Sequence, residues 1–151
     1  MNLLRKHDIS IFYWLKNLFL AYPSVAIADG YPTATLTLPT VSVEALDLRS
    51  RPFELGDRRG NPIRPWAIDV FADNKAQRDE FSYFILDALE SGIPVYEYDS
   101  GFSPTVVPQI GALQITEDGI LLKVVRVFPG TEEKLYWRMS ILFNTVYDSI
   151  V

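Results

Sequence analysis

The chain has 151 residues, with 14 Lys and Arg against 19 Asp and Glu, which gives a formal net charge of −5. This length predicts one domain that buries roughly two-thirds of the surface its unfolded chain exposes. The acidic balance argues against wrapping nucleic acid over a large area, because phosphate neutralisation needs clustered Lys and Arg. The chain contains no cysteine, which excludes disulfides, thiolate metal sites and a cysteine nucleophile, and fits assembly in a reducing cell.

The first predicted element is a helix over about residues 8–22. Asp8 or Ser10 can cap its start, and Pro23 stops it. One broad apolar stripe runs along this helix, and Tyr13 widens it beyond a single core contact. Two interpretations stay open: a terminal helix packed on its own sheet, or a helix docked against a neighbouring subunit. The stripe consists of Ile11, Phe12, Leu15, Leu18, Phe19 and Tyr22, with Trp14 beside it.

The apolar character of this N-terminal stretch also raises the question of a membrane span or a signal peptide. Lys16 and Asn17 interrupt the apolar run, which falls short of the ~20 residues that a span needs. No small-residue cleavage site follows it. We therefore expect no membrane segment here.

Strand and turn signals follow the first helix. Thr33–Leu38 alternates apolar and threonine residues, which predicts a half-buried strand. Turn-forming residues fill the stretch between Glu54 and Trp66, and they are expected to join a strand near Arg51–Leu55 to one that starts at Trp66. The sequence thus predicts a projecting β-hairpin or loop over Glu54–Pro65.

The middle of the chain reads as strand, helix, strand. The apolar run Trp66–Ala72 leads into Asn74, a good N-cap for a helix over about residues 75–91. Gly92 ends this helix because glycine adopts a positive φ without steric cost. The stretch Ile93–Tyr98 is then expected to be a strand. The predicted buried helix face comprises Phe81, Phe84, Ile85, Ala88 and Leu89.

Strands are predicted over about residues 111–148 at the C-terminal end. Ile120–Phe128 is apolar on both faces, as an interior strand covered on two sides would be. Leu135–Tyr147 alternates over its whole length, which is longer than one small core needs and leaves part of it available to pair with another chain. A proline-punctuated loop, Ser100–Ile110, is expected on the surface.

Together these elements predict a single α+β domain over residues 1–151. A mixed, largely antiparallel sheet is packed by two helices, and a hairpin or loop projects from it.

Potential catalytic groups are sparse. Asp69 with Glu97 would be the pair for a two-metal hydrolase or nuclease site, but Asp69 is expected instead to pair with an arginine across the sheet. His7 is the single histidine and has no nucleophile signature beside it. Gly56 and Gly60 are turn residues without the continuation of a phosphate loop. We expect no catalytic residue, no cofactor and no metal site.

Four stretches of the sequence, taken in order, resemble a known protein family. They are HDISIFYWL at 7–15, WxIDVFAxNKxQRDEFxYxIL at 66–86, GIPVYEYDSGF at 92–102 and EKLYWRMSI at 133–141. This order resembles tail terminator or tail-completion proteins, the small neck-type virion proteins of tailed bacteriophages. The resemblance covers most of the chain through packing and surface residues.

The resemblance implies a ring, commonly of six subunits, that caps the tail tube and presents a surface to the head connector. DNA would pass through the ring without specific binding, which an acidic chain tolerates. The protein would assemble in the host cytoplasm and reside in the virion.

Interface residues are chosen as aromatic and arginine side chains, because these dominate interface energetics and the chain holds nine Phe, eight Tyr and three Trp. The candidates are Phe12, Trp14, Arg58, Arg59, Phe102 and Trp137.

Alternatives remain beside the tail-terminator hypothesis. A head-completion or other neck adaptor protein needs a similar small subunit. A carboxylate-dependent hydrolase or nuclease would lose activity in Asp69→Asn. A nucleic-acid or peptide adaptor would bind through Arg58 and Arg59 in a salt-sensitive way.

Overall fold

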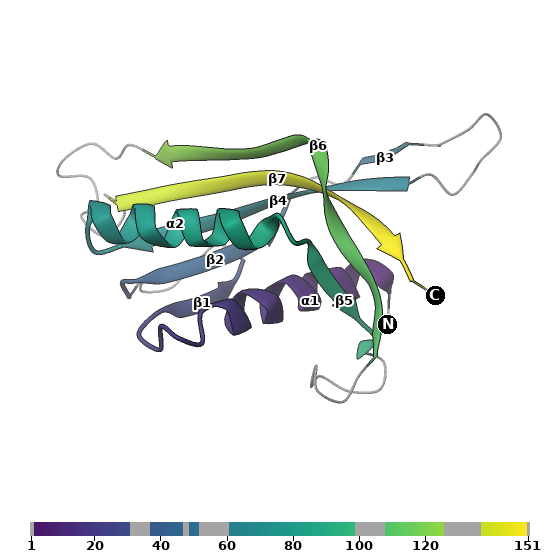
Figure 1. The fold of residues 1–151 in the computed structure, drawn as a ribbon, viewed down its shortest axis with the longest axis horizontal. Coiled ribbons are helices and arrows are strands. Elements are labelled where there is room, and N and C mark those ends of the chain that lie inside the picture. The colour runs from purple at the N-terminus through teal and green to yellow at the C-terminus, as the bar shows by residue number, and fades with distance from the viewer. Residues whose placement is uncertain are drawn as a thin grey trace.

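The computed structural model describes residues 2–30, 37–46, 49–51, 61–98, 108–125 and 137–150. These residues form two helices and a seven-stranded sheet (Figure 1). The α+β class predicted from the sequence is therefore confirmed. The elements are α1 (Leu3–Leu18), β1 (Ala26–Asp29), β2 (Thr40–Ala45), β3 (Arg49–Arg51), β4 (Asn61–Ala72), α2 (Lys75–Leu89), β5 (Ile93–Tyr96), β6 (Gln109–Val125) and β7 (Trp137–Ser149).

The strands lie in the order β1-β2-β4-β7-β6-β5, and β3 pairs with β4. Only β1 and β2 are parallel; all the other pairs are antiparallel, so the predicted mixed, largely antiparallel sheet is confirmed. Pairing of β6 with β7 shifts register between Ile115 and Ile120. At this bulge β6 bends: its first half lies between β5 and the end of β7, and its second half pairs with β7 (Figure 1).

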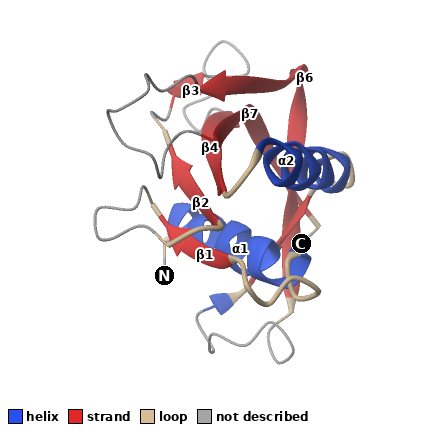
Figure 2. Cartoon of the chain, turned by 90° about the vertical axis from the view of Figure 1, so that its left-hand side faces the viewer, coloured by secondary structure: helices blue, strands red, loops and turns tan. Residues whose placement is uncertain are grey.

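Both helices lie on one face of the sheet, which curls around them (Figure 2). We call this the inner face and the opposite one the outer face. Alternate residues of β4 and β7 point to the inner face, as the period of a strand requires. One core cluster there joins Trp66, Ile68 and Val70 of β4, Met139, Ile141 and Phe143 of β7, Ile11 and Leu15 of α1, and Phe81, Ile85 and Leu89 of α2.

The N-terminal helix differs from its predicted bounds. It begins at Leu3, where the side chain of Asn2 accepts the amide of Leu4 at 2.8 Å, and it ends at Leu18 instead of 22. The two residues expected to cap it lie inside the helix and serve tertiary contacts. Asp8 accepts from Arg64, and the Ser10 hydroxyl accepts from the amide of Tyr96. A polar residue inside a helix can thus be mistaken for an N-cap when only the sequence is considered.

The central helix begins at the predicted residue and ends two residues before the predicted 91. Asn74 caps it by accepting the amide of Gln77 at 2.8 Å, and the Gln77 side chain accepts the amide of Asp73 at 2.8 Å in return. The helix ends at Leu89, and Gly92 follows with φ of 78°. On the predicted face Phe81, Ile85 and Leu89 are buried, while Phe84 and Ala88 are half-buried.

Two of the strand predictions before the central helix need correction. Residues 31–36 of the predicted Thr33–Leu38 strand lie outside the described residues, and Thr37 and Leu38 are not in a strand; β1 and β2 flank this region and were not predicted. β4 begins at Asn61, five residues before Trp66, because its first residues pair with β3 at Arg49–Arg51. The predicted hairpin is therefore formed by β3 and β4, and its residues 52–60 lie outside the described part.

The strand predictions after the central helix are partly wrong. β5 ends at Tyr96, two residues before the predicted end. Ile120–Phe128 is not an interior strand: its described part, up to Val125, lies at an edge of the sheet and is partly exposed. β7 alternates as predicted, but β4 and β6 flank it within the same chain, so its length needs no second chain.

The cap of α2 gives the first test. Asn74→Ala should lower the free energy of unfolding by about 1 kcal/mol, because the amide of Gln77 loses its acceptor. Denaturant unfolding measures the change. Asn74→Asp, which keeps an acceptor at this position, should stay close to wild type. Equal stability of the alanine variant and wild type would contradict the capping role.

Candidate association surface

The two carboxylates considered for catalysis belong to separate ion pairs. Asp69 is 5% exposed on the outer face, where it accepts from Arg138 Nη2 at 3.0 Å and from the hydroxyl of Ser140. The predicted pairing of Asp69 with an arginine across the sheet is thus confirmed. Glu97 Oε1 lies 2.6 Å from the Lys6 ammonium and ties the residue after β5 to α1. Within the described ranges, no group of three His, Asp or Glu side chains is arranged to hold a metal.

His7 is a buried structural residue. It is 1% exposed, its ring lies 4.9 Å from the ring of Tyr147, and neither ring nitrogen has a hydrogen-bond partner. Burial, and secondarily the charge of Arg64, lowers the pKa of His7 to about 4. His7 is therefore neutral at pH 7, and within the part of the chain described no nucleophile is hydrogen-bonded to it.

The interface candidates from the sequence fall into two groups. Phe12, Trp14 and Trp137 are half-buried and pack against the core cluster. The guanidinium of Arg78 also lies 5.8 Å from the centre of the Trp137 ring. For the first helix, this packing favours the interpretation that it lies on its own sheet. Arg58, Arg59 and Phe102 lie outside the described residues.

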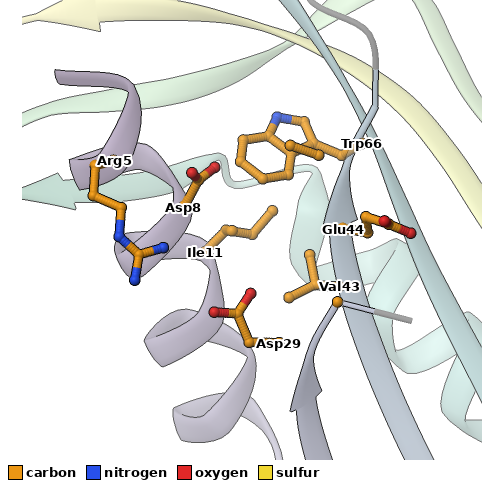
Figure 3. Close-up of a pocket in the computed structure, with 9 residues that line it drawn as sticks. Arg5, Asp8, Ile11, Asp29, Val43, Glu44 and Trp66 are labelled. Carbon is orange, nitrogen blue, oxygen red and sulfur yellow. The ribbon is translucent and has the colours of Figure 1, made fainter. Parts of the chain in front are cut away.

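A small cavity lies between α1 and the sheet (Figure 3). Ile11, Val43 and Trp66 form its apolar part, and its volume is about 110 Å³. Ligand pockets usually measure roughly 300–1,000 Å³, so this cavity is too small for most metabolites. One of its four charged groups, Asp8, is already paired with Arg64 at 2.9 Å. The charged residues that line it are Arg5, Asp8, Asp29 and Glu44.

A larger hollow of about 390 Å³ opens beside the β6 bulge. Here the extra residues between Ile115 and Ile120 interrupt the ladder with β7, so side chains diverge around a shallow depression. Most of the residues that line it are apolar, and two of these apolar residues, Leu46 and Leu121, are exposed. The lining residues are Leu46, Pro65, Trp66, Asp118, Gly119, Ile120, Leu121, Leu142, Phe143 and Asn144.

The second half of β6 continues this surface as a sheet edge. Ile120–Val125 pairs with β7 on one side, while β5 reaches only the first half of β6. No strand in the described part of the chain pairs with its other side. Leu121 is 58% and Val124 46% exposed. We call Ile120–Val125 together with the adjoining hollow the β6 edge surface.

Such an edge is a template for another strand, because alternate residues turn unpaired amide and carbonyl groups outward. Proteins usually protect an exposed edge with charge or proline, and this one carries a single charged side chain, Lys123. The sequence analysis missed this surface because an apolar run without context reads as an interior strand. Two signals could have revealed it: Lys123 inside the run, and the polar stretch Glu117–Gly119 directly before it.

No protein-family model and no curated protein matches this chain. Among the described helices, none is both long and apolar enough to cross a membrane. The β6 edge surface is therefore interpreted from its own geometry.

The Asp69 contacts predict a structural effect of substitution. Asp69→Asn should lower the free energy of unfolding by roughly 3 kcal/mol, because it removes a buried charge that Arg138 and Ser140 contact. Asp87→Asn on the exposed side of α2 should change it by less than about 0.5 kcal/mol. Denaturant unfolding compares the two. An Asp69→Asn variant as stable as the Asp87 control would contradict the structural role.

His7 predicts a loss of stability in acid. Its pKa in the folded protein, about 4, is below the unfolded value of 6.5, so protonation favours the unfolded chain. The contribution is complete above pH 6.5 and falls by up to about 3 kcal/mol as the pH drops to 4. In His7→Gln, which does not titrate, this part of the pH dependence should vanish. Parallel stability curves for the two proteins between pH 7 and pH 4 would refute the assignment.

Proposed function

We propose that this protein is a structural virion protein of a tailed phage that self-associates into a ring at the neck. The ring terminates the tail tube and joins it to the head connector. Six subunits are proposed because the resembled family commonly forms sixfold rings. The protein itself performs no catalysis in this proposal and needs no cofactor.

The observation that carries self-association is the β6 edge surface. A strand of six residues, paired on one side and bearing exposed Leu121 and Val124, lies next to an apolar hollow. A partner strand would pair the backbone groups of this edge and cover its exposed apolar side chains together. A ring also requires a heterologous interface, in which two different patches of one chain meet around a closed rotation.

The assignment to the phage neck rests on the resemblance of the stretches at 7–15, 66–86, 92–102 and 133–141. In the described parts of these stretches, Trp66 packs in the core, Trp137 packs against it and Asp69 forms an ion pair. A net charge of −5 suits a bore through which DNA moves without being held. A head-completion role would use the same self-association with a different partner.

Native mass measurement and negative-stain electron microscopy test the proposal, with and without the tail-tube protein. The wild-type chain should form rings, alone or at tube ends. Leu121→Glu should lose rings, because it places a charge in the exposed part of the β6 edge surface while barely changing the folded monomer. We expect a fall of at least about tenfold in assembled protein, which corresponds to about 1.4 kcal/mol.

Tyr83→Glu on α2 is the matched control, since Tyr83 is 53% exposed and lies on a different element. It should assemble like wild type, and both variants should keep the wild-type melting temperature within a few degrees. A wild-type chain that stays monomeric and ignores tube ends would overturn the tail-terminator proposal. Rings that bind head connectors but not tubes would replace it with a head-completion role.

A further inference from the structure

The two edge strands share four rows of paired residues across the sheet. A row is a set of residues that are paired from strand to strand across the sheet. Four consecutive residues of β1 each begin such a row, which crosses β2, β4 and β7 without a change of register and ends in the second half of β6. The rows are Ala26-Thr40-Phe71-Arg138-Val125, Ile27-Val41-Val70-Met139-Val124, Ala28-Ser42-Asp69-Ser140-Lys123 and Asp29-Val43-Ile68-Ile141-Leu122.

The two edge strands also run in opposite directions. β1 is parallel to β2, and the steps from β2 to β4, from β4 to β7 and from β7 to β6 are each antiparallel. Three reversals leave β6 antiparallel to β1. Like the second half of β6, β1 pairs with only one strand among the described residues.

We propose that the ring interface is an antiparallel strand pair between β1 of one copy and the second half of β6 of the next. This deepens the proposed function and rests on it. A rotation about an axis roughly along the strands changes neither the height nor the direction of a strand. The opposite directions of β1 and β6 therefore give antiparallel pairing, and their common rows give the register.

The side chains at the two edges fit this register. In the proposed pair Ile27 meets Val124, both from the inner face, and Ala28 meets Lys123, both from the outer face. The small side chains of Ala26 and Ala28 leave room for Val125 and Lys123 beside them. Apolar surface is thus placed against apolar surface on the side that the helices cover.

No like charges meet in the proposed pair of edges. Asp29 is the one charged residue of β1, and Lys123 is the one charged residue of Ile120–Val125; both are exposed. In the proposed register they lie one row apart and on opposite faces, since Asp29 shares its row with inner-face Ile68 and Lys123 shares its row with outer-face Asp69. Pairing of two β6 edges would instead bring two lysines together, which is unfavourable. The occupant of the β6 edge is therefore β1 of a second copy.

Cysteine cross-linking tests the register directly, because the natural chain contains no cysteine. Single variants Ile27→Cys and Val124→Cys are mixed, allowed to assemble with tube ends present, and oxidised. Opposite residues of an antiparallel pair lie about 4.5–5.5 Å apart at Cα, which is within the range of a disulfide. The mixture should give a disulfide-linked dimer at least tenfold above the level in either single variant.

A second pair covers the neighbouring row, Ala28→Cys with Lys123→Cys, because close and wide pairs alternate along an antiparallel ladder. The matched negative control is Ile27→Cys with Leu121→Cys, since Leu121 lies on the same β6 edge but points to the outer face. This control should give no dimer above the single variants. The chain with both Ile27→Cys and Val124→Cys should give a ladder of bands up to the closed ring.

The outcomes of this experiment distinguish a failure of the proposed strand pairing from a failure of the proposed function. Rings seen by microscopy without cross-links at either row would overturn the strand pairing and leave the proposed function standing. Cross-links in Val124→Cys alone would show a twofold contact between β6 edges and would also overturn the pairing. The absence of any assembly would overturn both proposals.

Discussion

The pairing of β4 with β7 is the constraint on which the rest of the structure depends. These strands are matched over ten consecutive residue pairs, from Ile63 with Val146 to Ala72 with Trp137. Their inner-face side chains form the centre of the core, so both helices are positioned by them. On the outer face the same register places Asp69 beside Ser140 and within reach of Arg138. A slip of one residue would exchange the two faces and lose both sets of contacts.

The first helix is fixed to this strand pair by one polar connection. Trp66 is buried and donates its indole hydrogen to the Thr145 hydroxyl at 2.9 Å, which links β4 to β7 through side chains. The Arg64 guanidinium lies 4.6 Å from the Trp66 ring, donates to the Leu4 carbonyl at 2.8 Å and pairs with Asp8. The helix is thus held to β4 through Arg64 and to the β5 end through Lys6 and Ser10, and Asp8 of the helix neutralises the buried arginine.

The sequence predicted those elements whose signals are local. Asn74 and Gly92 mark the ends of α2 because a cap and a positive φ act within a few residues, and the alternation of β7 follows from its two unlike faces. The first helix was shifted because Asp8 and Ser10 serve partners far away in sequence, Arg64 and Tyr96. The β6 edge could not be predicted, because whether a strand lies inside or at the rim of a sheet depends on pairing across the whole chain. The sequence-based interface candidates Phe12, Trp14 and Trp137 pack against the core cluster, and their part in an interface stays a prediction.

The shortness of β1 has a consequence for the timing of assembly. Four residues contribute few hydrogen bonds, so a contact made through β1 alone is weak. Weak contacts become durable in a closed ring, because the last subunit to join makes two contacts and the second forms within the same assembly. In the proposed ring, such a chain would remain monomeric while dilute and would associate where a template gathers it. Control over when copies join would then come from the template, without any chemical modification of the chain.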